Sequence, residues 1–133
     1  MTPIANANDR KTWLARLLMA VMLSVTLAAC ASTQIRYSQL VVLNKGMTPA
    51  QTSIALNQPP LSVHEVTEGG KTYTFHRYAL FNGVYSDLYL LCFEQDKLKF
   101  WGYLEEFRRY PDPKVNQAAE QAFDQILETQ PAR

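Results

Sequence analysis

The spacing of apolar residues changes three times along the chain. An uncharged apolar run, Leu17–Ala29, comes first, and two short helices are predicted after it, over 37–44 and 49–56. From Leu61 apolar and polar residues alternate, which is typical of strands with one buried face. From Pro113 onward the spacing is helical again. This order indicates an α+β protein whose first apolar run stands apart from the rest.

Residues that begin and end helices mark the two short helices. The first is predicted to end at Lys45-Gly46, because glycine readily takes the left-handed conformation that closes a helix. Thr48 is expected to cap the second helix through its hydroxyl, and Pro49 fits its first position because no N–H is lost there. Asn57 also tolerates the left-handed conformation, so the second helix should end there.

Four segments rich in alternating, aromatic or β-branched residues predict strands: Leu61–Thr67, Thr72–Leu80, Tyr85–Glu94 and Leu98–Phe107. Turn residues separate them at 68–71, 81–84 and 95–97. The first is expected at an edge of the sheet. Alternation in the last strand predicts one face with Leu98, Phe100, Gly102 and Leu104, and another with Lys97, Lys99, Trp101 and Tyr103.

The last helix has one apolar stripe. Asp112 is expected to cap it, and Pro131 marks its end. The apolar positions at helical spacing are Val115, Ala118, Ala119, Ala122, Phe123, Ile126 and Leu127. This stripe either covers the sheet of the same domain, against Trp101 and Tyr103, or binds in the groove of a partner protein.

The N-terminal segment has the three parts of a secretory signal. Arg10 and Lys11 precede the apolar run, and small residues follow it. The sequence Leu27-Ala28-Ala29-Cys30 resembles the lipobox of bacterial lipoproteins. The resemblance implies that residues 1–29 are a signal peptide, with cleavage between Ala29 and Cys30. It also implies diacylglycerol on the Cys30 sulfur and a third acyl chain on the new amine.

An uncleaved membrane anchor is the competing interpretation of this segment. The uncharged run of about 13 residues would span roughly 20 Å as a helix. A hydrocarbon core needs roughly 20 residues, and a longer run would bury Arg16. The lipoprotein interpretation is therefore favoured, with residues 30–36 as a lipidated tether.

The charge balance after cleavage is close to neutral. Ten basic and eleven acidic residues of the original 13 and 12 would remain, for a net charge of about −1. This balance excludes general nucleic-acid binding, which needs a basic surface. With Cys30 lipidated, Cys92 has no cysteine partner, so a disulfide framework is excluded and a buried thiol is expected.

Two stretches of the mature chain resemble one protein family. The sequence from Leu43 to Gln51 and then Ile54 to Pro59 resembles the "GMT…V…LG.P" signature of the SmpA/OmlA (BamE-like) family of outer-membrane lipoproteins, and the sequence from Leu90 to Leu98 resembles its hairpin. The resemblance implies two short helices packed on a three- to four-stranded antiparallel sheet, as in β-lactamase inhibitory proteins. The BamE-like domain would cover 37–110, and 111–133 would add the C-terminal helix and tail.

No arrangement of residues in the sequence indicates catalysis, a metal site or a small-molecule substrate. His64 and His76 lie in predicted strands without a second ligand at suitable spacing. Glu105 and Glu106 would point to opposite faces of a strand, which is a poor arrangement for acid–base chemistry. We therefore expect a protein that is not an enzyme and has no cofactor besides the covalent lipid on Cys30.

Cationic and aromatic residues near the last predicted strand form a candidate interface: Lys97, Lys99, Trp101, Tyr103, Arg108 and Arg109. Such residues suit a protein interface, where Trp, Tyr and Arg concentrate binding energy. They also suit a lipid headgroup region. In a third interpretation the last helix covers the two rings, and no such surface exists.

These observations together predict an accessory or scaffold lipoprotein anchored on the periplasmic face of the outer membrane. Ala31 follows the lipidated cysteine, and the resemblance implies outer-membrane sorting because the inner-membrane Asp is missing there. The expected partners are the membrane, through the N-terminal lipid, and an envelope protein such as a component of β-barrel assembly. The alternative function is an envelope-enzyme inhibitor or ligand-binding module of the β-lactamase-inhibitor type. A third is binding of phospholipid headgroups.

Overall fold

The computed structural model describes residues 10–18 and 33–130, and the chain separates into two compact units, Met1–Ser32 and Thr33–Arg133. In the first unit, residues 10–18 form an exposed helix. Within the described residues, no helix combines the length and the apolar character that crossing a membrane requires. Cys30 and the predicted cleavage site lie outside the described residues.

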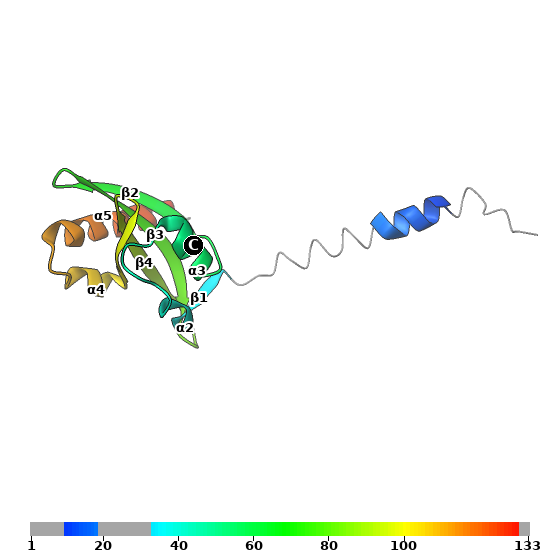
Figure 1. Ribbon diagram of the computed structural model, residues 1–133, viewed down its shortest axis with the longest axis horizontal. Coiled ribbons are helices and arrows are strands. Elements are labelled where there is room, and N and C mark those ends of the chain that lie inside the picture. The colour runs from blue at the N-terminus through cyan, green and yellow to red at the C-terminus, as the bar shows by residue number, and fades with distance from the viewer. Residues whose placement is uncertain (1–9, 19–32, 131–133) are drawn as a thin grey trace, which may run out of the picture. The chain divides into compact units, whose positions relative to one another are not determined.

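The second unit is an α+β fold built on one five-stranded mixed sheet (Figure 1). Its strands are β1 (Gln34–Arg36), β2 (Ser62–Glu68), β3 (Lys71–Phe81), β4 (Ser86–Glu94) and β5 (Lys97–Gly102). β3, β4 and β5 follow one another as antiparallel neighbours. β1 and β2 both pair with the edge of β3 that faces away from β4. β2 pairs with the first residues of β3, and β1 pairs with its last residues.

β1 makes the sheet mixed, because it runs parallel to β3 with Ile35 opposite Leu80. The prediction of a three- to four-stranded antiparallel sheet was therefore wrong in this detail. Residues 34–36, the last part of the predicted tether, form a strand of the sheet. A strand of three residues is too short to show alternation in the sequence. The strand forms because the fully buried side chain of Ile35 packs in the second hydrophobic cluster, with residues such as Leu43 and Leu56.

The hairpin turns form where the sequence predicts them. Gly69 and Gly70 have positive φ angles of 57° and 77° between β2 and β3. Gln95 and Asp96 have positive φ angles of 51° and 57° between β4 and β5, so Lys97 is already the first residue of β5. Two positive φ angles match the twist of a two-residue hairpin, although neither Gln95 nor Asp96 is glycine.

Both short helices form, but the first is shorter than predicted. α2 covers only Tyr37–Leu40, whereas α3 covers Pro49–Ala55. The predicted cap of α3 is confirmed: the Thr48 hydroxyl accepts a hydrogen bond of 3.2 Å from the Gln51 N–H. Asn57 follows α3 with a φ angle of 55°, as its tolerance of this conformation predicts.

A fourth helical segment replaces the end of the last predicted strand. β5 stops at Gly102, and α4 (Leu104–Arg108) follows, so the prediction of a strand to Phe107 was wrong. The Tyr103 N–H donates to Glu106 Oε2 at 2.7 Å, which caps the helix. α4 then buries Phe107 completely. Alternation in a short segment did not reveal this capping pattern.

The last helix, α5 (Pro113–Thr129), begins as predicted, since Asp112 Oδ1 accepts from the Lys114 N–H at 3.0 Å. The buried positions of its stripe are Val115, Ala118, Ala119, Ala122 and Ile126. Phe123 is half-buried and Leu127 is exposed. The stripe therefore covers the domain's own sheet, where α5 contacts β2 and β3.

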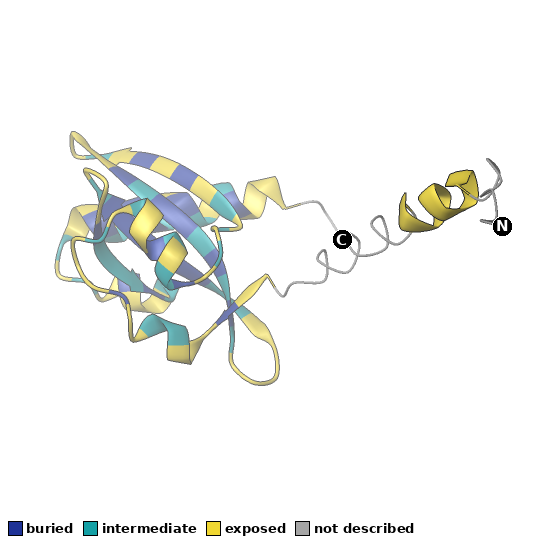
Figure 2. Cartoon of the chain, turned by 45° about the vertical axis from the view of Figure 1, so that its right-hand side comes forward, coloured by how far each residue is buried: buried dark blue, intermediate teal, exposed yellow. Residues whose placement is uncertain are grey.

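Two cores lie on opposite faces of the sheet. Figure 1 shows α4 and α5 on one side and α2 and α3 on the other. The first core joins the α5 stripe and Phe107 to alternate residues of the strands, such as Phe75 and Leu90. The second core joins Leu56, at the end of α3, to the strand residues whose side chains point to the opposite face, such as Tyr78. The alternation of buried and exposed residues is visible along β2 in Figure 2.

Candidate interface at the edge of the sheet

A β-bulge in β5 decides how the predicted interface residues are arranged. Phe93 pairs with Leu98 and Cys92 pairs with Phe100, so Lys99 is an extra residue between the two pairs. Such a bulge reverses the order in which side chains alternate beyond it. The prediction that Lys99 and Trp101 share a face was wrong for this reason.

The two aromatic rings lie on the α2–α3 face. Trp101 and Tyr103 are half-buried there against the second core. The Tyr103 ring meets the Tyr89 ring edge-on at a centroid distance of 5.1 Å, and its hydroxyl contacts the Tyr37 hydroxyl. Burial is the largest of several causes that raise the pKa of Tyr103. Because α5 covers the opposite face, the interpretation in which its stripe packs on these rings was wrong.

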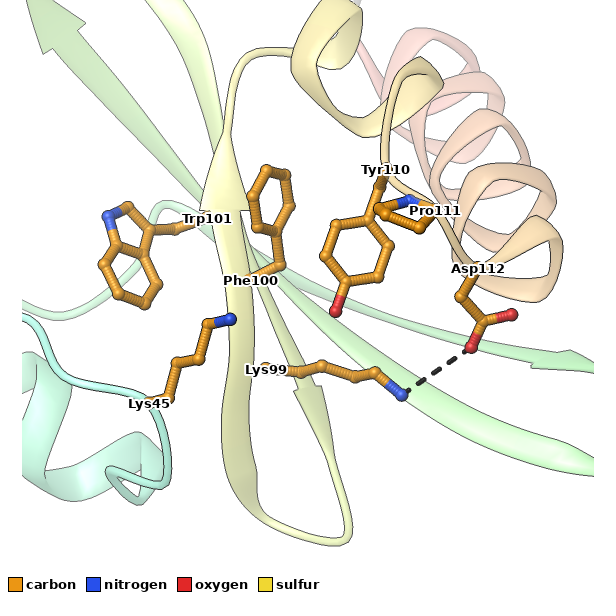
Figure 3. Close-up of a pocket in the computed structure, with 7 residues that line it drawn as sticks. All are labelled: Lys45, Lys99, Phe100, Trp101, Tyr110, Pro111 and Asp112. Atoms are coloured by element: carbon orange, nitrogen blue, oxygen red, sulfur yellow. Dashed lines mark ion pairs between the residues drawn. The ribbon is translucent and has the colours of Figure 1, made fainter.

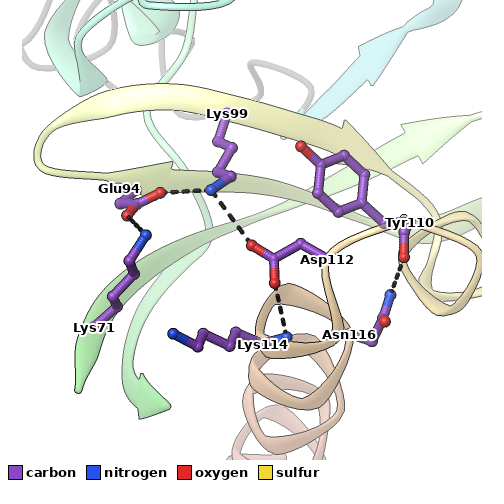
Figure 4. A network of polar contacts seen from close by, with 7 residues as sticks. All are labelled: Lys71, Glu94, Lys99, Tyr110, Asp112, Lys114 and Asn116. Atoms are coloured by element: carbon purple, nitrogen blue, oxygen red, sulfur yellow. Dashed lines mark hydrogen bonds and ion pairs between the residues drawn. The ribbon is translucent and has the colours of Figure 1, made fainter. Parts of the chain in front are cut away.

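The lysines have different surroundings. Lys99 lies on the α5 side, where Nζ is 2.6 Å from Glu94 Oε2 and 3.7 Å from Asp112 Oδ2 (Figure 4). Its hydrogen bond to Glu94 raises the pKa of Lys99 and, with a second bond from Lys71, lowers the pKa of Glu94. Lys97 is exposed and makes no ion pair with the described residues.

The two arginines also play different parts. Arg108 contacts Glu105 on its own helix and Glu120 on α5, and its Nη2 lies 3.3 Å from Glu120 Oε2. These carboxylates raise its pKa, and the contacts join α4 to α5. Arg109 is exposed and follows the last residue of α4. The six predicted residues therefore do not form one continuous surface.

The structure instead brings a subset of them together at a cleft along the outer edge of β5. This cleft, which we call the β5 cleft, has a volume of about 730 Å³ and is lined by Lys45, Lys99, Phe100, Trp101, Tyr110, Pro111 and Asp112 (Figure 3). Its volume lies within the range of small-ligand sites in proteins. A smaller hollow of about 350 Å³ adjoins it, shares Lys45, Lys99 and Tyr110, and reaches Lys97.

The two walls of the β5 cleft come from the two faces of the sheet. Figure 3 shows Trp101 on one side of β5 and Phe100 with Tyr110 on the other. The rings of Phe100 and Tyr110 are 4.6 Å apart between centroids. The segment that carries Tyr110 is held by Asn116 of α5, whose Nδ2 donates to the Tyr110 carbonyl at 2.8 Å (Figure 4).

Lys45 lines the cleft, although the sequence indicated it only as the end of a helix. It lies in the turn before α3, and its side chain reaches the cleft beside Trp101 (Figure 3). Among the described residues, its ammonium has no carboxylate within ion-pair distance. Its position depends on contacts of the 46–47 backbone with β5, so no local pattern in the sequence could have revealed it.

The remaining chemically reactive side chains are buried. Cys92 is a fully buried free thiol, as predicted, and burial raises its pKa to about 12. His76 is buried against the Phe93 ring at 4.6 Å, and burial lowers its pKa. His64 Nε2 lies 2.9 Å from the Ser62 hydroxyl. Within 10–18 and 33–130, no three His, Cys, Asp or Glu residues are grouped for metal binding.

No protein-family model matches the chain, and no curated protein matches it. The resemblance to the SmpA/OmlA family therefore stays a prediction from the sequence, and the β5 cleft is interpreted from its own geometry.

Proposed function

We propose that this chain is a non-enzymatic lipoprotein, anchored by lipid on Cys30 to the periplasmic face of the outer membrane, where it binds an envelope protein. The observation that carries the proposal is the short distance in sequence between Cys30 and the folded unit. That unit begins at Thr33, and the first strand at Gln34. A lipid on Cys30 would hold the sheet close to the membrane surface without a membrane-binding face of its own.

The attachment itself can be strong without help from the domain. Each buried methylene of an acyl chain contributes about 0.8 kcal/mol, and stable anchoring needs at least two chains. A triacylated cysteine exceeds that requirement. The cleft and the exposed cations beside it then stay available for a protein partner, such as a component of β-barrel assembly.

The packing of the sheet favours this role over the alternative of an inhibitor of the β-lactamase-inhibitor type. That alternative needs an open sheet face rich in aromatic residues. α5 covers one face, and on the other Tyr78 and Tyr89 are buried in the second core. Half-buried aromatic residues, Phe100, Trp101 and Tyr110, line the cleft at the β5 edge instead, which suits the binding of a partner segment.

Metabolic labelling tests the lipid anchor. Cells that express the full chain are fed an alkyne fatty acid, and the purified protein is examined for the label. We expect labelling of the wild type and of Cys92→Ala, a matched control that removes the buried thiol, but none of Cys30→Ala. An unlabelled wild type, or a labelled Cys30→Ala variant, would refute the anchor.

Photo-cross-linking in intact envelopes tests the partner. A photoactivatable residue replaces Lys45 in the cleft or, as a control, Asp124, which is exposed on α5. We expect one defined envelope protein to be cross-linked from position 45 and not from position 124. Envelopes that yield no cross-linked protein from any exposed position would count against a protein-binding role.

A further inference from the structure

The outer edge of β5 is closed at both ends by the chain itself. At one end, the Leu98 N–H donates to the Met47 carbonyl at 2.7 Å, and the Leu98 carbonyl accepts from the Gly46 N–H at 2.8 Å. At the other end, the Tyr103 N–H donates to Glu106 Oε2 at 2.7 Å, and its carbonyl accepts from the Glu106 N–H at 3.0 Å. Trp101 lies between these two closed positions.

The register of β5 points the backbone of Trp101 into the β5 cleft. The N–H and C=O of Leu98 bond to residues 46 and 47, on the side away from β4. The pair of Leu98 with Phe93 is therefore a non-hydrogen-bonded pair of the antiparallel ladder. The bulge at Lys99 then places the next such pair at Leu91 and Trp101. The Trp101 N–H and C=O therefore face away from β4, and within the described residues no backbone bond joins them to another element.

An edge with a free donor and a free acceptor can pair with another extended chain. Here only one residue of the edge is free, so a bound segment gains two backbone hydrogen bonds and spans about three residues before it meets the closed ends. Its central residue, directly opposite Trp101, points to the same face as Trp101 and Lys45. The two flanking residues point to the other face, where Phe100 and Tyr110 form an apolar wall.

The charges around the cleft favour an acidic central residue. Lys99 is already neutralised by Glu94 and Asp112. Lys45 at the cleft and Lys97 in the adjoining hollow have no carboxylate partner among the described residues, so the residues that line these two hollows carry excess positive charge. A carboxylate on the Trp101 side would lie next to Lys45.

We propose that the β5 cleft binds an extended segment of a partner protein with the pattern apolar–acidic–apolar, in which the acidic residue pairs with Trp101 through the backbone and with Lys45 through its side chain. This inference rests on the proposed protein-binding role and adds the chemistry of the segment. The bound segment extends the sheet by one residue pair, and the two apolar side chains cover Phe100 and Tyr110.

Trp101 makes a direct test feasible. The chain has two tryptophans, Trp13 and Trp101, so the full-length chain with Trp13→Phe, purified in detergent, reports on the cleft by fluorescence alone. The probe is the blocked pentapeptide acetyl-Thr-Val-Glu-Val-Thr-amide. We expect a saturable change in Trp101 emission, and binding about 5-fold weaker or more for the peptide with Lys in place of Glu.

Two further arms separate the side-chain and backbone contributions. Lys45→Ala should weaken binding of the Glu peptide about 5-fold, whereas Arg109→Ala, which removes an exposed cation outside the cleft, should leave it unchanged. Methylation of the Glu backbone nitrogen in the peptide removes one of the two ladder bonds and should also weaken binding.

The inference is overturned by equal binding of the Glu and Lys peptides, by an unchanged affinity of Lys45→Ala, or by no saturable change in emission. An identical emission change on adding mixed micelles of detergent and phosphatidylglycerol, without peptide, would assign the cleft to lipid and overturn it too. The fatty-acid labelling and the cross-linking do not depend on this peptide chemistry. If they succeed while the peptide fails, the proposed function stands and the segment chemistry is wrong.

Discussion

The two faces of the sheet are covered in different ways. One continuous helix of 17 residues, α5, covers the first face beside the short α4. The contact surface of α5 is made largely of alanine, which lets its backbone approach the strands closely. Several separate pieces cover the second face, among them α2, α3 and the turn that carries Met47. Their buried side chains, such as Ile35 and Leu56, are far apart in sequence.

This difference shows two ways to close a small core. The α5 face depends on apolar area from a single amphipathic segment. The second face depends on apolar area from several segments that are far apart in sequence. Hydrogen bonds between distant segments occur on both faces: Gln121 Nε2 of α5 donates to Glu68 Oε2 at 2.6 Å, and on the second face Gln39 Nε2 donates to the Leu56 carbonyl at 2.7 Å. The second face also buries the imidazole ring of His76. Substitutions at Phe107, Ile35, Asp112 and His76 test this contrast.

The largest effect is expected on the α5 face, from Phe107→Ala. Phe107 is fully buried, and its ring meets the Phe75 and Phe100 rings edge-on. Loss of this side chain should lower the free energy of unfolding by about 3–5 kcal/mol, because a cavity is left between α4 and the sheet. Urea unfolding followed by circular dichroism measures it. Leu127→Ala, at an exposed position, should change it by less than about 0.5 kcal/mol.

A somewhat smaller effect is expected on the second face, from Ile35→Ala. Its side chain is fully buried although β1 has only three residues. The substitution should lower the free energy of unfolding by about 2–4 kcal/mol, and Ile35→Val should lower it by about 1 kcal/mol. The same unfolding experiment measures both. If neither variant is destabilised, residues 34–36 act as tether rather than as part of the sheet.

Asp112→Ala should lower the free energy of unfolding by about 1 kcal/mol, because the first turn of α5 loses its cap. Asp112→Asn is the matched control. It removes the charge near Lys99 but keeps an oxygen that can accept from the Lys114 N–H, so most of the stability should remain. Thermal unfolding distinguishes the two variants. Equal losses would mean that the ion pair, and not the cap, stabilises this end of α5.

The smallest effect is expected at His76 on the second face, as a pH dependence of the free energy of unfolding. Burial lowers the pKa of His76 below its ordinary value of 6.5, so the unfolded chain takes up a proton at higher pH than the folded chain does. Its contribution to stability is therefore complete above pH 6.5 and declines as the pH falls toward the folded pKa. Urea unfolding between pH 7.5 and 5 should show this decline in the wild type and a shallower one in His76→Gln.

Local signals predicted the parts of the fold that depend on neighbouring residues. The caps Thr48 and Asp112, the glycine turn before β3 and the stripe of α5 all form as predicted, because each depends on hydrogen bonds or spacing within a few residues. Burial of the α5 stripe against the sheet was also one of the two outcomes predicted. The lipid on Cys30 depends on local sequence as well, and it stays a prediction.

The sequence alone thus determined α3, the hairpins that join β2 to β5, the amphipathic face of α5 and the burial of the Cys92 thiol. Only the tertiary structure decided which face each element covers. The bulge at Lys99 sends Trp101 and Lys99 to opposite faces, and α4 ends β5 before Phe107. Lys45 reaches Trp101 only because the chain before α3 bonds to Leu98, about 50 residues later. Such contacts arise from packing between distant segments, and no local pattern of residues encodes them.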